Sequence, residues 1–314
     1  MKIAYMFPGQ GSQIIGMGKD FYDAFDSVKA IYEKAKSITG IDVSNISFEG
    51  PEDILNNTKY TQICIYTLSM AILDIIKKNN IKADVACGLS LGEYSALTCS
   101  GVISLDDGFR IVSKRGELMQ DLLPSGEYLM AAVLGIEDEI VDQVCSSVTS
   151  GFVRGVNYNC IGQVVISGDK KAVEEACDSF KLKGAKTILL KTSGPFHTEK
   201  LIKASEALHS KLEEISFNKL NTDVIKNIDA TFYKNEDDYV EILSKHVISP
   251  VYFSKTISKM LECGVDTFVE IGPGKTLTSF VKRMTKDKDI RFYTINSVEN
   301  LNDFLETFKG EIYE

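Results

Sequence analysis

The fold of this chain is decided by one stretch, Ala83-Asp84-Val85-Ala86-Cys87-Gly88-Leu89-Ser90-Leu91-Gly92-Glu93-Tyr94-Ser95-Ala96-Leu97. The residues up to Gly88 are mostly apolar and predict a short strand, and those after Gly92 predict a helix. Between them, residues 88–92 form the pattern Gly-x-Ser-x-Gly. A strand, a tight turn and a helix in this order make a nucleophile elbow, which holds a serine hydroxyl clear of the backbone. The pattern therefore predicts Ser90 as a nucleophile.

The residue types in this turn have physical reasons. Gly88 and Gly92 lack side chains that would clash where strand and helix nearly touch, and glycine tolerates strained dihedral angles. The start of the helix after Ser90 offers unpaired N–H groups and the positive end of the helix dipole, and both suit a developing oxyanion. The alternative is a bare strand-turn-helix in which the serine is incidental.

Length and composition indicate an ordinary globular protein. The chain has 314 residues, of which 44% are hydrophobic and 25% are charged, as in typical soluble domains. This length allows one large domain, or a large domain that carries a smaller one. No apolar run approaches the ~20 residues that cross a bilayer, so we expect no membrane association. The apolar run at residues 3–7 is too short for a signal peptide and predicts a first strand.

Charge and cysteine content narrow the partners and the compartment. The formal charge of −9 argues against nucleic acid, which favours basic surfaces. The seven cysteines are odd in number and form no Cys-x-x-Cys pattern, which favours reduced thiols in the cytoplasm over disulfides or a metal site. One group of lysines predicts either a solvated face or a patch for an acidic protein partner. It consists of Lys181, Lys183, Lys186 and Lys191.

Short apolar runs alternate with amphipathic segments along most of the chain. This alternation predicts an α/β fold with a largely parallel sheet, which together with the elbow indicates an α/β-hydrolase-like domain. The expected strands are residues 3–7, 84–88, 223–228, 266–271 and 290–295, and the expected helices are residues 61–78, 104–122, 198–215 and 251–263.

The middle of the chain departs from this alternation. Its expected elements are strand 128–134, helix 137–148, strand 152–158, strand 163–167, helix 170–183 and strand 185–191. The order β-α-β-β-α-β is that of a ferredoxin-like unit. We therefore predict a small ferredoxin-like subdomain at residues 124–191, inserted into a discontinuous large domain of residues 1–123 and 192–314. The cleft between the two is the expected substrate site.

A serine nucleophile needs a base, and the chain has three histidines. His197 follows the Gly-Pro turn at residues 194–195, where the chain re-enters the large domain, and such loops favour catalytic groups. His209 lies in a predicted helix among polar residues, which indicates a solvent-facing position. His246 is either structural or a support for the site. His197 is therefore the candidate base, and a helix-terminal histidine without a catalytic role is the alternative.

The predicted helix at residues 104–122 places Arg115 on an apolar face with Ile111 and Met119. A guanidinium there either extends outward to solvent or is buried with a partner, because breaking a buried ion pair costs ~3–5 kcal/mol. The partner is either a structural Asp or Glu, or a substrate carboxylate held bidentately by the planar guanidinium. The residues leave both alternatives open.

Two glycine-rich turns lie outside the elbow. Residues 272–276 look like part of a phosphate-binding loop, but Val269 stands where that pattern requires glycine. Residues 9–13 follow the first strand, and their N–H groups either contribute to an oxyanion hole or only form a tight turn.

Six short motifs occur in order along nearly the whole chain. They are Phe7-Pro8-Gly9-Gln10-Gly11-Ser12-Gln13, Gly88-Leu89-Ser90-Leu91-Gly92-Glu93-Tyr94-Ser95-Ala96, Arg115-Gly116, Asn157-Tyr158-Asn159, Gly194-Pro195-Phe196-His197 and Glu270-Ile271-Gly272-Pro273-Gly274. Together they resemble the motifs of the malonyl-CoA:acyl carrier protein transacylase family of bacterial fatty-acid synthesis.

The resemblance implies a ping-pong acyl transfer from malonyl-CoA to the phosphopantetheine thiol of acyl carrier protein, with no permanently bound cofactor. Ser90 would become malonylated, with His197 as general base. The N–H groups of Gln10 and Leu91 would form the oxyanion hole. The backbone carbonyl of His246 would orient His197.

The resemblance also implies roles in binding the acyl group. Arg115 would hold the free carboxylate of malonate, Phe196 would narrow the pocket against a methyl branch, and Asn159 would contact the substrate. The chain departs from the family in two places. Leu89 replaces the usual histidine, and His246 replaces the usual glutamine or asparagine. Neither change removes the predicted base or the carbonyl, so we expect activity to persist.

Three other functions share parts of this pattern. A stand-alone acyltransferase of polyketide assembly would have the same residues. A serine thioesterase or other hydrolase would share the elbow, but such enzymes normally have Ser, acid and His in chain order, and the chain has no convincing acid. A non-catalytic module that binds carrier protein would not need Ser90, His197 and Arg115. We expect the malonyl transferase, as a monomer in the cytoplasm.

Overall fold

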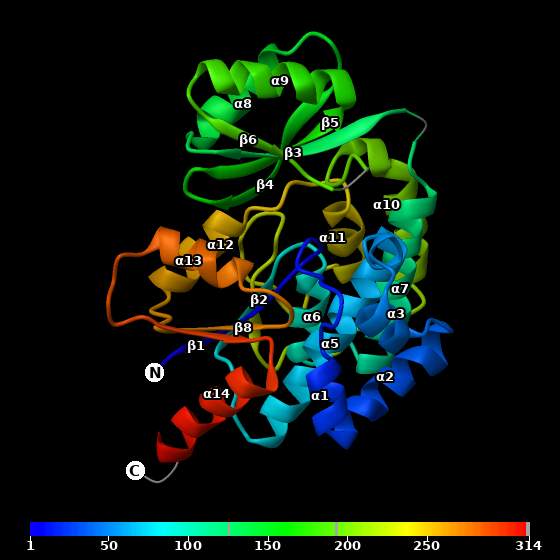
Figure 1. Cartoon of the computed structure of the whole chain (residues 1–314), viewed down its shortest axis with the longest axis vertical. Helices are drawn as coiled ribbons and strands as arrows, with labels where there is room; N and C mark the ends of the chain where they lie inside the picture. Colours follow the sequence, from blue (N-terminus) through cyan, green and yellow to red (C-terminus); the bar gives the residue numbers. More distant parts are fainter. Residues whose placement is uncertain (125, 192–193, 312–314) are drawn as a thin grey trace.

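The computed structural model describes residues 1–124, 126–191 and 194–311. It is a mixed α/β structure with a parallel sheet and a separate antiparallel sheet, which lies with α8 and α9 at the top of Figure 1. Ser125, in the turn expected to open the subdomain, and Thr192 and Ser193, in the turn expected to close it, lie outside the described residues.

The parallel sheet has five strands in the order β7-β2-β1-β8-β9. Every neighbouring pair is parallel. A central parallel strand is buried on both faces, which explains why its residues are nearly all apolar. The strands are β1 (Ile3–Phe7), β2 (Val85–Gly88), β7 (Asp223–Val224), β8 (Thr267–Ile271) and β9 (Arg291–Ile295).

Helices cover both faces of this sheet. Side chains of β1 alternate between two cores, with Tyr5 and Phe7 in the core that includes α5 and α7, and Met6 in the core that includes α12 and α13. The helices of this part are α1 (Lys19–Ala24), α2 (Asp26–Thr39), α3 (Val43–Glu49), α4 (Glu52–Leu55), α5 (Thr58–Lys78), α6 (Gly92–Cys99), α7 (Leu105–Asp121), the 3₁₀ helix η1 (Glu199–Leu201), α10 (Ile202–Leu212), α11 (Tyr239–His246), α12 (Phe253–Glu262), α13 (Thr276–Met284) and α14 (Val298–Glu311).

The antiparallel sheet has the order β4-β5-β3-β6. One face carries α8 and α9 over a separate apolar core that includes Val133, Ile166 and Phe180. The opposite face, with Met130 and Val165, packs toward the large core of the parallel-sheet part. The elements are β3 (Tyr128–Leu134), α8 (Asp138–Ser147), β4 (Val153–Cys160), β5 (Gln163–Asp169), α9 (Lys170–Leu182) and β6 (Lys186–Leu189).

Backbone hydrogen bonds join the antiparallel sheet to the part of the molecule that contains the parallel sheet. The Tyr158 N–H donates to the Val251 carbonyl at 2.9 Å, and the Val251 N–H donates to the Val156 carbonyl at 2.8 Å. These bonds tie β4 to the segment between α11 and α12. The antiparallel sheet is therefore held against the large part at the level of the cavity described below.

Two expected elements differ from the structure. The strand expected at residues 223–228 ends at Val224, and the chain then makes a turn in which Lys226 N–H donates to the Thr231 carbonyl. The helix expected at residues 198–215 is a 3₁₀ turn followed by α10, which ends at Leu212. Glu213 and Glu214 follow, and negative charge is unfavourable at a helix C-terminus.

Within the described residues, no helix has both the length and the apolar character that a membrane span requires. All seven cysteines belong to the described part of the chain and are free thiols.

Candidate active site

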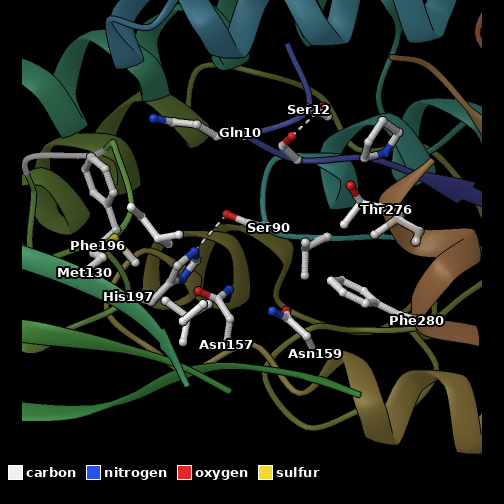
Figure 2. Close-up of a pocket in the computed structure, with 18 of the residues that line it drawn as sticks. Gln10, Ser12, Ser90, Met130, Asn157, Asn159, Phe196, His197, Thr276 and Phe280 are labelled. Atoms are coloured by element: carbon white, nitrogen blue, oxygen red, sulfur yellow. Dashed lines mark hydrogen bonds between the residues drawn. The ribbon is translucent and has the colours of Figure 1, made fainter. Parts of the chain in front are cut away.

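A cavity of about 240 Å³ lies between the two sheets. The large part contributes Gln10, Ser90, Arg115 and His197 to its walls, and the antiparallel sheet contributes residues that include Asn159. Figure 2 shows Ser90 and His197 pointing toward one another inside this cavity. The predicted cleft is therefore where the candidate residues from distant parts of the chain meet.

Ser90 lies on a strained turn between β2 and α6. Its φ angle is 53°, in the left-handed region that few non-glycine residues adopt. A side chain at Gly88 would collide with the backbone of Gly92, and one at Gly92 would collide with the Phe7 carbonyl. The two glycines of the elbow are thus required by close backbone approach, as predicted.

His197 is hydrogen-bonded to Ser90. Ser90 Oγ lies 2.8 Å from His197 Nε2, and His197 Nδ1 faces the carbonyl oxygens of His246 at 3.0 Å and Ser249 at 3.1 Å. Carbonyl oxygens only accept, so this arrangement assigns the proton to Nδ1 and leaves Nε2 free as the acceptor. Burial, and then the charge of Arg115, lower the pKa of His197 to about 4.

Arg115, on α7, is only 1% exposed, so it does not extend outward to solvent. Its guanidinium donates to Gln62 Oε1 at 2.6 Å and to Ser90 Oγ at 3.1 Å. It also lies 5.4 Å from the centre of the Tyr94 ring. Within the described residues it forms no ion pair with a carboxylate. A buried cation whose hydrogen-bond acceptors are neutral, at the wall of a cavity, is suited to bind an anionic ligand.

Two backbone donors lie beside the nucleophile. Gln10 lines the cavity, and Leu91 directly follows Ser90 at the start of α6. Neither N–H has a hydrogen-bond partner among the described residues. Free N–H groups at these two positions are available to an oxygen of a ligand.

The remaining candidates occupy different parts of the site. Phe196 and Asn159 line the cavity, and Asn159 Oδ1 has no hydrogen-bond partner among the described residues. His246 is fully buried behind His197, with the two rings 5.2 Å apart. His209 lies outside the cavity on α10, partly exposed and within 4.0 Å of carboxylates of Glu213 and Glu241.

The chain is similar along nearly its whole length to known acyl transferases. The acyl transferase domain family matches residues 4–313. A malonyl CoA-acyl carrier protein transacylase from Bacillus subtilis (strain 168) is 39% identical over 313 residues, which are 99% of this chain and 98% of that protein. The chain belongs to the malonyl-CoA:acyl carrier protein transacylase family. The identification made from the six motifs is thus confirmed.

Solved structures agree with this family. The crystal structure of a malonyl CoA-acyl carrier protein transacylase from Clostridium perfringens Atcc 13124 has a TM-score of 0.94 and 41% identity, and covers 100% of this chain and 99% of that one. A malonyl-transacylase in complex with its type II PKS acyl-carrier protein has a TM-score of 0.93 and 35% identity, over 98% of this chain and 100% of that one. Both are members of one transacylase family with this fold.

Three residues beside the site were not predicted. Gln62 accepts from Arg115, Asn227 binds the backbone of the elbow, and Glu93 is fully buried behind it. Asn227 carried a weak signal, since a polar residue near the carboxyl end of a parallel strand often faces a ligand site. Gln62 and Glu93 lie in helical stretches where a sequence does not distinguish a buried polar side chain from an exposed one.

Proposed function

We propose that this protein transfers the malonyl group of malonyl-CoA to the phosphopantetheine thiol of acyl carrier protein, for fatty-acid synthesis. The observation that carries the proposal is the buried Arg115 guanidinium beside Ser90 and His197, which pairs with no carboxylate in the described part of the chain. A malonyl thioester has a free carboxylate at the end of its short acyl chain that is opposite the thioester. The planar guanidinium can hold it with two hydrogen bonds while the thioester carbonyl faces Ser90.

The first half-reaction makes a malonyl-serine ester. Ser90 Oγ attacks the thioester carbonyl and its proton moves to His197 Nε2. The oxyanion of the tetrahedral intermediate accepts hydrogen bonds from the N–H groups of Gln10 and Leu91, where one such donor is worth ~2.7–4 kcal/mol. The C–S bond then breaks, and the coenzyme A thiolate takes the proton from His197.

The second half-reaction reverses these steps with a new thiol. His197 Nε2 takes the proton of the phosphopantetheine thiol, whose sulfur attacks the malonyl-serine carbonyl. The ester C–O bond breaks and Ser90 Oγ recovers the proton. The buried, neutral state of His197 at physiological pH supports both roles, because an unprotonated imidazole is needed at the start of each half.

The roles of the remaining residues belong to the same proposal. Phe196 narrows the acyl site, Asn159 contacts the bound substrate, and the His246 carbonyl orients His197. No permanently bound cofactor takes part in the scheme. We place the protein in the cytoplasm, where its free thiols would stay reduced, and we expect it to act as a monomer.

The proposal also divides the chain into the two sides of the cavity. Residues 124–191 form a ferredoxin-like subdomain, supported by the strand order β4-β5-β3-β6 and the separate core under α8 and α9. Residues 1–123 and 192–314 form a hydrolase-like domain that contains the elbow, supported by the parallel strands beside β2.

The experiment offers malonyl-, methylmalonyl- and acetyl-CoA together to the protein and follows acylation by intact-protein mass spectrometry. We expect a malonyl adduct to dominate, and it should disappear when holo acyl carrier protein is added, with malonyl-carrier protein as the product. Release of free malonate at the rate of transfer would instead support a hydrolase, and absence of any adduct would refute the proposal.

A further inference from the structure

A buried carboxyl group lies behind the cavity. Glu93, the second residue of α6, is fully buried and is not among the described residues that line the cavity. Its Oε1 accepts hydrogen bonds from the Tyr233 hydroxyl at 2.8 Å and the Asn227 N–H at 3.2 Å. Its Oε2 lies 3.2 Å from His246 Nδ1. The carboxyl group therefore contacts three segments that are distant from it in sequence.

One of these contacts leads to the nucleophile. The Asn227 side chain accepts from the Ser90 N–H at 2.7 Å and donates to the Gly88 carbonyl at 2.7 Å. It thereby holds the turn in which Ser90 keeps its positive φ, a strained conformation that persists only where the surroundings enforce it. Asn227 lies outside any helix or strand. The bond from its own N–H to Glu93 therefore helps to fix the position from which its side chain binds Ser90 and Gly88.

The contact on the other oxygen leads to the base. His246 is the last residue of α11, and its carbonyl oxygen accepts from His197 Nδ1 at 3.0 Å. Glu93 Oε2 lies against the ring of the same residue, and among the described residues neither Oε2 nor Nδ1 has a hydrogen-bond partner. Burial raises the pKa of Glu93 to about 7 and lowers the pKa of His246 well below its usual value. His246 is therefore neutral, and its ring packs against the Glu93 carboxyl group at 3.2 Å without a hydrogen bond.

We propose that Glu93 is a positioning residue for acyl transfer, which fixes the Ser90 turn through Asn227 and the carbonyl that orients His197 through His246. The inference rests on the proposed function and adds to it a single group that sets the distance between nucleophile and base. Displacements of about 1 Å between reacting groups cost on the order of 10²-fold in rate. Glu93 thus acts on the rate of acylation without touching substrate.

The test compares Glu93→Gln with Glu270→Gln. Gln keeps the size of the side chain, and its amide oxygen can still accept from Tyr233 and Asn227. It replaces the carboxyl oxygen that faces His246 Nδ1 by an N–H donor and removes the negative charge that this group can carry. Glu270 is the matched control, because it is also fully buried and accepts from the N–H groups of Leu277 at 3.1 Å and Thr278 at 2.8 Å. Leu277 lines the cavity, but Glu270 itself bonds to none of Ser90, Asn227 and His197. Each variant is measured for thermal unfolding, for the first-turnover release of coenzyme A from malonyl-CoA, and for KM.

We expect Glu93→Gln to slow the first turnover by about 10- to 100-fold with little change in KM. A change that only displaces the nucleophile from the base lowers kcat and leaves substrate binding as it was. Glu270→Gln should lower the unfolding temperature about as much as Glu93→Gln does. It should leave the rate of the first turnover within about threefold of the wild-type rate. A folded Glu93→Gln with the wild-type rate, or with a change in KM alone, overturns the inference. So does an equal slowing of both variants.

Tyr233→Phe keeps the inference testable if Glu93→Gln does not fold. It removes one donor to Glu93 and touches neither catalytic residue, and we expect a severalfold slower first turnover with unchanged KM. A wild-type rate in folded Tyr233→Phe would then overturn the inference. Failure of the wild-type protein itself to form malonyl-Ser90 would refute the proposed function, an outcome distinct from normal acylation in the variants.

Discussion

Two regions of the molecule bury a cation, and they satisfy it differently. Lys226 Nζ forms an ion pair with Asp237 at 2.8 Å, in the turn after β7. Arg115 is more deeply buried but donates to the neutral side chains of Gln62 and Ser90. Each cation also lies 5.4 Å from the centre of a tyrosine ring.

The difference separates a structural charge from a binding charge. A buried charge that a neighbouring carboxylate neutralises contributes to folding, and breaking the pair is costly. A buried charge without such a neighbour is retained at a cost to stability, which is offset when an anionic ligand supplies the missing partner. Under the proposed function, Arg115 at the wall of the cavity is a charge of the second kind. The following predictions test this contrast, from the largest expected effect to the smallest.

Ser90→Ala removes both the nucleophile and one acceptor of Arg115. We expect the malonyl adduct to vanish from the intact-protein mass spectrum and kcat to fall by about 10³-fold or more, as for other covalent catalysts. Ser210→Ala, on the exposed face of α10, is the control and should acylate normally. An adduct that persists on the Ser90 variant would place the nucleophile elsewhere.

Arg115→Ala removes the charge that lacks a carboxylate. Loss of one partner from a buried charged pair costs about 2–5 kcal/mol, so kcat/KM for malonyl-CoA should fall by about 30- to 4,000-fold, and acylation by acetyl-CoA much less. Arg110→Ala, exposed on the same helix, should change neither rate. Equal losses with both thioesters would make Arg115 structural, like Lys226.

Lys226→Met removes the charge that has a carboxylate. The variant leaves Asp237 largely buried without its partner, so we expect the free energy of unfolding to fall by about 3 kcal/mol in denaturant titration. The ratio of malonyl to acetyl acylation should stay at the wild-type value. The double variant Lys226→Met with Asp237→Leu should recover part of the stability. A changed acyl ratio would contradict the contrast between the two cations.

The pH dependence of acylation reports whether Arg115 acts on His197. Protonated His197 cannot accept the Ser90 proton, so the rate falls as pH drops through its pKa, which burial and Arg115 lower to about 4. The acid limb with acetyl-CoA should therefore lie well below pH 6.5, the ordinary histidine value. Arg115→Ala should move the limb to higher pH, and Lys226→Met should not. A wild-type midpoint near 6.5 would contradict the assignment.

Phe196→Ser gives the smallest expected effect. A wider acyl site should raise kcat/KM for methylmalonyl-CoA relative to malonyl-CoA by about tenfold, because one methyl group in an apolar pocket is worth ~1–3 kcal/mol. Competition between the two thioesters measures the ratio directly. Phe217→Ser, outside the cavity, is the control, and an unchanged ratio in Phe196→Ser would remove Phe196 from the acyl site.

Local patterns predicted most of the elements. The strand expected at residues 128–134 has those bounds in the structure, and the elbow has the expected order of strand, turn and helix. These elements are short apolar runs bounded by glycine or polar residues, so each carries its own signal. The prediction of a strand at residues 223–228 was wrong at its end, because the chain turns after Val224 and places the Asn227 side chain against the backbone of Ser90.

The candidate site divides in the same way. The sequence by itself determined the elbow around Ser90, the apolar face that carries Arg115 and the loop that carries His197. Turn chemistry and helix periodicity are local properties, and they can be read along the chain. The motifs in order then identified the family.

Only the tertiary structure decided which groups meet. It gave Arg115 neutral acceptors instead of a carboxylate, and it joined Glu93, Asn227 and His246 behind Ser90 and His197. Asn227 and His246 are more than a hundred residues from Glu93 along the chain. Contacts over such separations depend on how the sheets and helices pack, and burial, which sets the charge and pKa of these groups, exists only after packing.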